Sequence, residues 1–392
     1  MIKRLILPTA TVLAVAAAAP VQAIPAFARR YEVKCHFCHD GYPKLNPMGY
    51  AFRARGFRME KEEAFELDKW ARSVPVILRA SGTHYFFEGA DDTNQGFLKG
   101  VSAGNLGQRL SYWVDDGVLI HEADRSGDHF THTRPDNAWA RLELIRAGKL
   151  YLKGGRLELD LPFTQTRTPH LFSYDIYFAN TGNESDSIGF FQDGVEVGGA
   201  LPHEVHWSAA VVAGHDAPNA GDINSRAERF DGNVFLRLAK RFDRHRVGGF
   251  AYIGRNTLAR SATNTADDNL LRLGADLSVW IERLNLYGVA MYGRNDNSIL
   301  DPRFSGGTGQ PLSFSGGFAQ ADYHVRDFAV LTLRGNLVSR PPGSSAGPRQ
   351  TFASVFPGLQ LFVYEHLKLS FEYGFLNRNR NDFGAVQVDL AF

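Results

Sequence analysis

From residue 73 to the end of the chain, apolar and polar residues alternate with a period of two. Val74, Val76 and Leu78 open this series, and comparable runs recur between polar breaks. Strict alternation puts apolar side chains on one face of a strand and polar side chains on the other. The runs predict about sixteen strands, at 74–86, 97–105, 108–120, 137–145, 150–159, 187–200, 205–214, 229–242, 246–257, 269–281, 284–294, 311–325, 329–339, 350–364, 367–376 and 382–392.

The segments between these strands alternate in length. Short breaks fall at 202–204, 243–245, 282–283, 326–327 and 365–366, and long polar segments fall at 122–135, 162–186, 215–228, 258–268, 295–310 and 340–349. Short turns at one end and long loops at the other are typical of transmembrane barrels, whereas a soluble β-sandwich does not require this regularity. We therefore predict a mainly-β fold in which residues 73–392 form a porin-like antiparallel barrel in contact with outer-membrane lipid.

The last predicted strand gives a second indication of this class. Val386, Val388, Leu390 and Phe392 alternate with polar or small residues, and the sequence ends on Phe392. A terminal strand that ends in phenylalanine resembles the assembly signal of bacterial outer-membrane β-barrels. The alternative interpretation is the edge strand of a soluble sandwich.

The first residues have the pattern of a secretory signal peptide. Lys3 and Arg4 precede an apolar stretch over 5–20, and Val21-Gln22-Ala23 provides small or apolar residues at the cleavage positions. Residues 1–23 are therefore predicted to direct Sec-type export and to be removed. The expected destination is the bacterial outer membrane.

Residues 24–72 are predicted to form a small helical segment ahead of the barrel. A helix is expected over 48–57, with Asn46 as its N-cap and Pro47 at its first position, and a second helix over 61–72. About fifty residues make a small independent core, so a bound cofactor would supply apolar surface that the segment needs.

Composition narrows the functional classes. The chain has 43 basic and 42 acidic residues, which gives no reason to expect a nucleic-acid partner. The mean hydropathy is −0.24, and no stretch after the signal approaches the 18 apolar residues of a transmembrane helix. The 29 phenylalanines, 14 tyrosines and 39 glycines suit the aromatic girdles and tight turns of a barrel.

Cys35 and Cys38 are the only cysteines in the 392 residues, and with His39 they form the pattern C-x-x-C-H. In c-type haem attachment, each thiol forms a thioether with one vinyl group and the histidine becomes the proximal iron ligand. A structural zinc site needs about four ligands, and a redox dithiol needs a βαβ setting that the flanking sequence lacks. A disulfide is the other alternative. We predict one covalent haem c.

The sequence combines a signal peptide, a haem motif and a barrel pattern. In this it resembles the fused cytochrome–porins of the bacterial outer membrane, in which a monohaem segment precedes a single-chain barrel. The specific motifs are FARRYEVKCHFCH at 27–39, YPKLNPMG at 42–49 and GFRM at 56–59, whereas the barrel is matched by pattern alone. The best-known members are iron oxidases of iron-oxidising bacteria. The resemblance implies electron transfer across the outer membrane, with extracellular Fe(II) or another donor outside.

The sixth iron ligand is assigned to Met59, because it lies twenty residues after His39 and falls within the matched GFRM. Met48 is the alternative, followed by a histidine or no protein ligand. A methionine ligand raises the reduction potential relative to two histidines, which suits a donor couple with a potential as high as Fe(III)/Fe(II).

Side chains around the haem motif are expected to cover or hold the macrocycle. The aromatic candidates are Phe27, Phe37, Tyr42, Tyr50 and Phe52, and the cationic candidates are Arg29, Arg30, Arg53, Arg55 and Arg58. The arginines are expected either to pair with haem propionates or to dock the segment against lumen carboxylates such as Asp115 or Asp116, unless they form only a solvated face.

The leading functional hypothesis is an electron conduit with one haem that passes electrons to a periplasmic c-type cytochrome. Such a protein would be an oxidoreductase without bond-making chemistry at its substrate. One alternative is a diffusion porin whose haem segment is a periplasmic appendage. The other is outward electron transfer to an extracellular acceptor.

Overall fold

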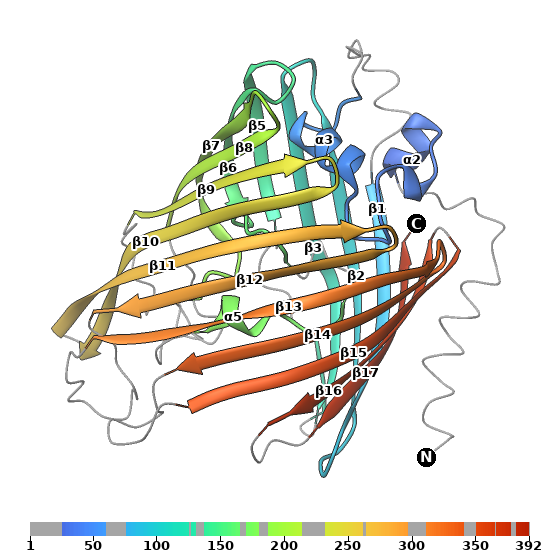
Figure 1. Cartoon of the computed structure of the whole chain (residues 1–392), viewed down its shortest axis with the longest axis vertical. Helices are drawn as coiled ribbons and strands as arrows, with labels where there is room; N and C mark the ends of the chain where they lie inside the picture. Colours follow the sequence, from blue (N-terminus) through green and yellow to red (C-terminus); the bar gives the residue numbers. More distant parts are fainter. Residues whose placement is uncertain are drawn as a thin grey trace.

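The chain forms a closed antiparallel β-barrel in the computed structural model (Figure 1). The structure describes residues 26–59, 76–124, 127–130, 137–164, 170–179, 187–213, 232–261, 264–296, 311–340, 350–364, 366–377 and 382–391. The signal peptide, the boundary at 72–73, the predicted helix over 61–72 and the terminal Phe392 lie outside these residues. The prediction of a mainly-β barrel is confirmed.

Sixteen strands form the ring, and a short seventeenth strand pairs beside it. The strands are β1 Val76–Phe87, β2 Thr93–Asn105, β3 Leu110–Asp124, β4 Gly127–Phe130, β5 Asn137–Ile145, β6 Leu150–Leu157, β7 Gln192–Leu201, β8 Val205–Val212, β9 Asn233–Phe242, β10 His245–Ser261, β11 Asn264–Ile281, β12 Leu284–Asn295, β13 Leu312–Arg326, β14 Ala329–Arg340, β15 Gln350–Tyr364, β16 Leu367–Leu376 and β17 Phe383–Ala391. β17 pairs with β1, with Arg79 opposite Ala391, and this pairing closes the ring. β3 pairs with β5 through its first half and with β4 through its last residues.

Two predicted loops are partly wrong. The stretch 122–135 contains the β3–β4 hairpin, and the stretch 258–268 is mostly paired, with Leu258 opposite Ala266 in the β10–β11 ladder. Both stretches carry polar residues that suggest loops. The ladder hydrogen bonds nevertheless continue, because an antiparallel pair satisfies its backbone whatever the polarity of its side chains.

The barrel wall is apolar outside and polar inside. In β9, Leu236 and Leu238 are 43% and 57% exposed, whereas Arg237 between them is buried. In β11, Leu273 is exposed in the same way beside the buried Arg272. This arrangement reverses that of a soluble protein and is typical of a barrel whose outer surface contacts lipid.

The two ends of the barrel differ. Short connections at 106–109, 146–149, 202–204, 243–244, 282–283 and 327–328 all lie at the end where β1 begins and β17 finishes. We call this end the short-turn mouth. The longer connections, such as the one between β6 and β7, lie at the opposite end, as the sequence predicts.

Four short helical elements accompany the barrel in the described residues: α2 Ala26–Tyr31, the 3₁₀ helix η1 Cys35–Phe37, α3 Pro47–Ala54 and α5 Asp175–Phe178. The predicted cap of α3 is confirmed, because the Asn46 side chain accepts a hydrogen bond from the Gly49 N–H. α3 ends before the predicted Phe57, since Gly56 and Phe57 have φ of 63° and 62°.

None of the described helices has the length and apolar character needed to cross a membrane.

Described residues of the connection between β6 and β7 fold into the barrel, contrary to the prediction from the sequence. The stretch 162–186 was predicted to be a polar loop, yet Tyr174, Ile176 and Tyr177 within it are at most 2% exposed. The Tyr174 ring stacks on Phe318 of β13 at 3.8 Å between centroids, and α5 contacts β13 and β14. An apolar cluster therefore occupies part of the lumen, where a water-filled porin has polar side chains.

Candidate haem-attachment site at the short-turn mouth

The residues of the C-x-x-C-H motif share one tight turn. The backbone N–H groups of Cys38 and His39 both donate to the Cys35 carbonyl, at 3.1 and 3.0 Å. Both cysteines are partly exposed, and neither forms a disulfide. The structure thus brings together two thiols and one imidazole, the donor set that covalent haem attachment requires.

Asn46 and Gly49 hold this turn against α3. The Asn46 amide donates to the carbonyls of His36 and Phe37, both at 3.1 Å, and its backbone N–H donates to Cys38 O at 3.0 Å. A Cβ at Gly49 would lie 2.1 Å from the Cys38 carbonyl oxygen. Only glycine therefore lets α3 approach the turn this closely.

His39 is set up as a neutral imidazole. Burial lowers its pKa below the usual value, and this effect outweighs the opposing contacts with the backbone of Pro43 and Lys44. The ring also packs edge-to-face on Tyr42, at 5.4 Å between centroids. A neutral imidazole is the form that ligates a metal, so the residues present fit a c-type haem.

The methionines lie in different surroundings. Met59 is partly buried against the apolar cluster inside the barrel, while Met48 is the second residue of α3 and is adjacent to Gly49. Packing accounts for the position of Met59 without reference to iron. Its role as the sixth ligand, with Met48 as the alternative, stays a prediction.

Residues 26–59, which we call the haem segment, are docked in the short-turn mouth, and Lys44 makes the central contact. Its Nζ donates to Asn285 Oδ1 at 2.6 Å and to Asp322 Oδ2 at 2.7 Å. The ammonium also lies 4.5 Å from the centre of the Tyr287 ring and 5.2 Å from that of Trp280. Lys44 is 6% exposed, so its charge is withdrawn from water and matched by the barrel wall.

A second set of contacts holds the C-terminal end of α3. Arg141 of β5 donates to the carbonyls of Arg53 and Ala54, the last two residues of the helix. Arg58 donates to the carbonyls of Gly107 and Leu110 at 3.0 and 3.1 Å, and it lies 3.6 Å from Glu143.

One of the predicted alternatives, docking against a lumen carboxylate, holds for Arg58, although the carboxylate is that of Glu143. Arg58 pairs with Glu143, whereas Asp115 binds Lys99 at 3.1 Å and Trp113 at 2.6 Å within the barrel wall. Carboxylates on neighbouring strands have the same inward orientation, so the sequence alone does not distinguish between them.

Some of the expected aromatic residues join the segment to the barrel. Phe27 stacks on Phe57 at 5.1 Å, and Phe57 stacks on Trp139 of β5 at 6.1 Å. Phe52 packs in the same group. Phe37, by contrast, is 42% exposed beside the haem turn.

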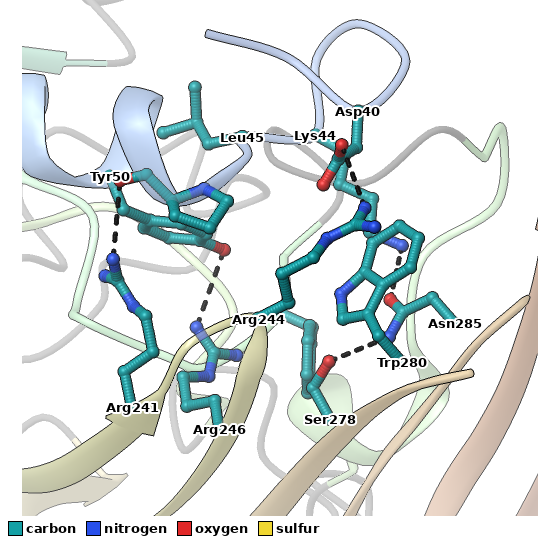
Figure 2. Close-up of a pocket in the computed structure, with 12 residues that line it drawn as sticks. Asp40, Lys44, Leu45, Tyr50, Arg241, Arg244, Arg246, Ser278, Trp280 and Asn285 are labelled. Carbon is teal, nitrogen blue, oxygen red and sulfur yellow. Dashed lines mark hydrogen bonds and ion pairs between the residues drawn. The ribbon is translucent and has the colours of Figure 1, made fainter. Parts of the chain in front are cut away.

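A pocket separates the haem segment from the wall formed by β9 to β12 (Figure 2). Four lining residues are cationic: Lys44, Arg241, Arg244 and Arg246. The acidic lining residue is Asp40, which follows His39 and accepts a hydrogen bond from Arg244 at 3.3 Å. Sequence reasoning missed these arginines, although their concentration around the short turn 243–244 was a visible signal.

Comparison with protein-family models and with curated proteins finds no match. Solved outer-membrane proteins are similar in structure. One is OmpTdeltaL8, a loop L8 deletion mutant of OmpT from Vibrio cholerae, with a TM-score of 0.57 and 11% identity over 81% of this chain and 98% of that chain. Another is Salmonella typhi OmpF in complex with daunomycin, with a TM-score of 0.56 and 13% identity over 81% of this chain and 97% of that chain.

A third is an anion-selective porin from Comamonas acidovorans, with a TM-score of 0.56 and 11% identity over 81% of this chain and 98% of that chain. At such low identity the likeness establishes the fold alone and carries no information about haem. The chain has the fold of a porin-like, sixteen-stranded β-barrel.

Proposed function

We propose that the protein is an outer-membrane electron-transfer protein that binds one haem c covalently through Cys35 and Cys38, with His39 as proximal ligand. The observation that carries this proposal is the position of the C-x-x-C-H turn. It belongs to a segment that is docked in the mouth of the barrel, with Lys44 buried against Asn285 and Asp322. The motif is therefore fixed at the barrel mouth, in contrast to a loosely tethered appendage.

The short-turn mouth is assigned to the periplasmic side, because outer-membrane barrels have short periplasmic turns and longer extracellular loops. Phe37 and His36, both exposed beside the haem turn, would then face the periplasm. A c-type cytochrome in that compartment is the proposed electron acceptor. Bound haem supplies one-electron chemistry at this mouth.

Extracellular Fe(II) is the proposed donor. Each Fe(II) oxidised to Fe(III) releases one electron, which passes through the site at the barrel mouth to the periplasmic acceptor. Support for this donor comes from the sequence resemblance to fused cytochrome–porins, and other donors of similar potential fit the same arrangement. In the reverse direction, the site would deliver electrons to an extracellular acceptor.

Diffusion through the lumen is the second candidate, and the porin-like fold favours it. Two features of the described residues oppose an open pore. The haem segment is docked in one mouth, and the buried side chains of Leu161, Tyr174 and Ile176 occupy part of the lumen.

The test uses the full-length protein made in a cell that installs c-type haem. We expect one covalent haem per chain, reduction of that haem in an optical titration with Fe(II), and low conductance in planar bilayers. The Cys35→Ser/Cys38→Ser variant is the control, and it should form the barrel but lose haem and Fe(II)-dependent reduction.

Each result has a distinct consequence. Haem that is absent from the mature wild-type protein would overturn the proposal, and haem that Fe(II) cannot reduce would overturn the choice of donor. A strongly negative midpoint potential would favour outward transfer. High conductance together with an Fe(II)-inert haem would favour the diffusion porin.

A further inference from the structure

Two arginines face each other across neighbouring strands at the short-turn mouth. Arg241 of β9 is directly opposite Arg246 of β10 in the antiparallel ladder. Both occupy the inward-facing register of their strands, in line with the buried Arg237 and Phe250. Like charges directly opposite each other on one face of a sheet destabilise the pair. Such an arrangement therefore points to an anion that balances it.

The neighbouring carboxylates do not supply this balance. Among the described residues, no carboxylate lies within ion-pair distance of Arg241, whose guanidinium donates to the Pro47 carbonyl at 3.3 Å. Arg246 lies 3.4 Å from Asp276, but Arg237 already binds that carboxylate through two hydrogen bonds, at 2.8 and 3.1 Å.

The other charges around the pocket are already matched. Lys44 is paired with Asp322 at 2.7 Å, and Arg244 is paired with Asp40 at 3.3 Å. Arg244 also lies over the Trp280 ring, at 3.6 Å from its centre. Among the described residues, Arg237, Arg241 and Arg246 thus have only the Asp276 carboxylate within ion-pair distance.

The pair faces the haem segment across the pocket. Figure 2 shows the two guanidinium groups reaching from the barrel wall toward Tyr50 of α3. They lie 5.1 and 5.7 Å from the centre of the Tyr50 ring. The opposite wall of the pocket includes Asp40, the residue directly after His39. Any anionic group that enters this pocket would lie next to the haem turn.

We propose that Arg241 and Arg246 form a carboxylate-binding site, and that its occupants are the two propionate groups of the haem bound at Cys35, Cys38 and His39. This inference rests on the haem attachment in the proposed function. Arginine suits the role, because its guanidinium has five N–H donors. Arg241 uses a donor on the Pro47 carbonyl, and Arg246 uses donors on the Tyr50 hydroxyl and the Pro162 carbonyl. The remaining N–H groups are the ones proposed to bind the carboxylates. Three arginines (Arg237, Arg241 and Arg246) and one carboxylate (Asp276) have a net charge of +2, which two propionates would balance.

A free anion such as phosphate would bind the same two arginines. The experiment distinguishes a free anion from the haem propionates. The midpoint potential of the haem is measured in the full-length holoprotein for Arg241→Gln, for Arg246→Gln and for the double variant. Lys240→Gln is the matched control, because it removes the same charge one residue away in the outward-facing register of β9. Retention of the folded barrel is checked by its heat-modifiable mobility on gels.

We expect both single variants to lower the midpoint potential and the double variant to lower it further, while Lys240→Gln leaves it unchanged. The reason is that a cation beside the propionates favours the reduced haem, which carries one positive charge less. Arg241→Lys should lower the potential less than Arg241→Gln, since it keeps the charge and loses only the forked geometry.

The second arm measures thermal unfolding with inorganic phosphate. Under the proposal, phosphate stabilises the haem-free Cys35→Ser/Cys38→Ser protein through the vacant arginine pair and has little effect on the holoprotein. Equal stabilisation of both forms with unchanged potentials would overturn the proposal in favour of a free-anion site. Unchanged potentials without any phosphate effect would overturn it altogether. Absence of covalent haem in the wild type would instead refute the proposed function itself.

Discussion

Replacing Lys44 with methionine should undock the haem segment. Methionine keeps much of the length of the side chain but removes the ammonium, which leaves Asp322 at 0% exposure with the Gln320 amide at 2.7 Å as a remaining donor. Removing one partner of a buried ion pair costs about 3–5 kcal/mol, because the other charge stays buried without compensation. At about 1.4 kcal/mol per factor of ten, the docked state loses roughly two to three and a half orders of magnitude in population relative to the undocked state.

Hydrogen exchange of the α3 amides measures this change directly. These amides exchange when the segment leaves the mouth or when α3 itself opens, so their protection reports the free energy of opening. We expect Lys44→Met to raise their exchange rates by roughly two orders of magnitude or more, provided that undocking is the dominant opening. Amides of the barrel strands opposite the short-turn mouth should be unaffected.

Two further variants make the test specific. Lys34→Met removes a lysine from an exposed position of the same segment and should leave the protection of α3 unchanged. Lys44→Met/Asp322→Asn removes both charges and should recover part of the loss, since the buried carboxylate is then neutral. If α3 in Lys44→Met stays within about tenfold of the wild type, the ion pair does not hold the segment, and the account of the docked mouth is wrong.

Three other substitutions test separate parts of the account. Gly49→Ala should lower the yield of covalent haem, because the added Cβ would lie 2.1 Å from Cys38 O; a full haem complement on a stained gel would contradict this. Met59→Ala should lower the midpoint potential or change the low-spin absorption spectrum, and an unchanged spectrum would transfer the ligand assignment to Met48 or a histidine. Ile176→Ala should destabilise the barrel by about 2–5 kcal/mol in thermal unfolding, because Ile176 is 0% exposed, whereas truncation of a lipid-facing leucine at the barrel surface should cost less.

The barrel was predictable because its signal is local. A strand that faces lipid on one side and the lumen on the other must alternate, so each run in the sequence carries its own evidence. Leu236 and Leu238 face outward on β9, as their alternation with Phe235 and Arg237 indicates. The start of α3 was equally local, since the Asn46 cap acts on the Gly49 N–H only three residues away.

The inward-folded segment between β6 and β7 was not predictable in the same way. Tyr174, Ile176 and Tyr177 belong to no sustained alternating run, and the polar residues around them suggest a loop. Their burial depends on partners such as Phe318, more than 140 residues away in the sequence. The conformation of this segment therefore depends on contacts with residues far away in the sequence, and the local sequence pattern does not reveal those contacts.

The candidate site also has a part that the sequence predicts locally and a part that depends on distant contacts. Cys35, Cys38 and His39 could be proposed as the candidate haem-attachment residues because the motif lies within five consecutive residues. The contacts that position the motif join Lys44 to Asp322, which are 278 residues apart. The pairing of Lys44 with Asp322 cannot be predicted from the sequence, because it forms only when the barrel closes and the haem segment docks in its mouth.

The docked geometry makes the two candidate functions compete for one segment. Electron transfer requires α3 to stay in the short-turn mouth, because the haem turn is packed against it through Gly49. Diffusion requires the same helix to leave, since its contacts with Arg141 and Arg241 cross the mouth. Any change that undocks the segment should therefore raise conductance and at the same time release the redox site from its fixed position. A barrel that conducts freely while its haem keeps the wild-type potential would need a path around the docked segment, and the pocket beside Arg241 is where that path would have to begin.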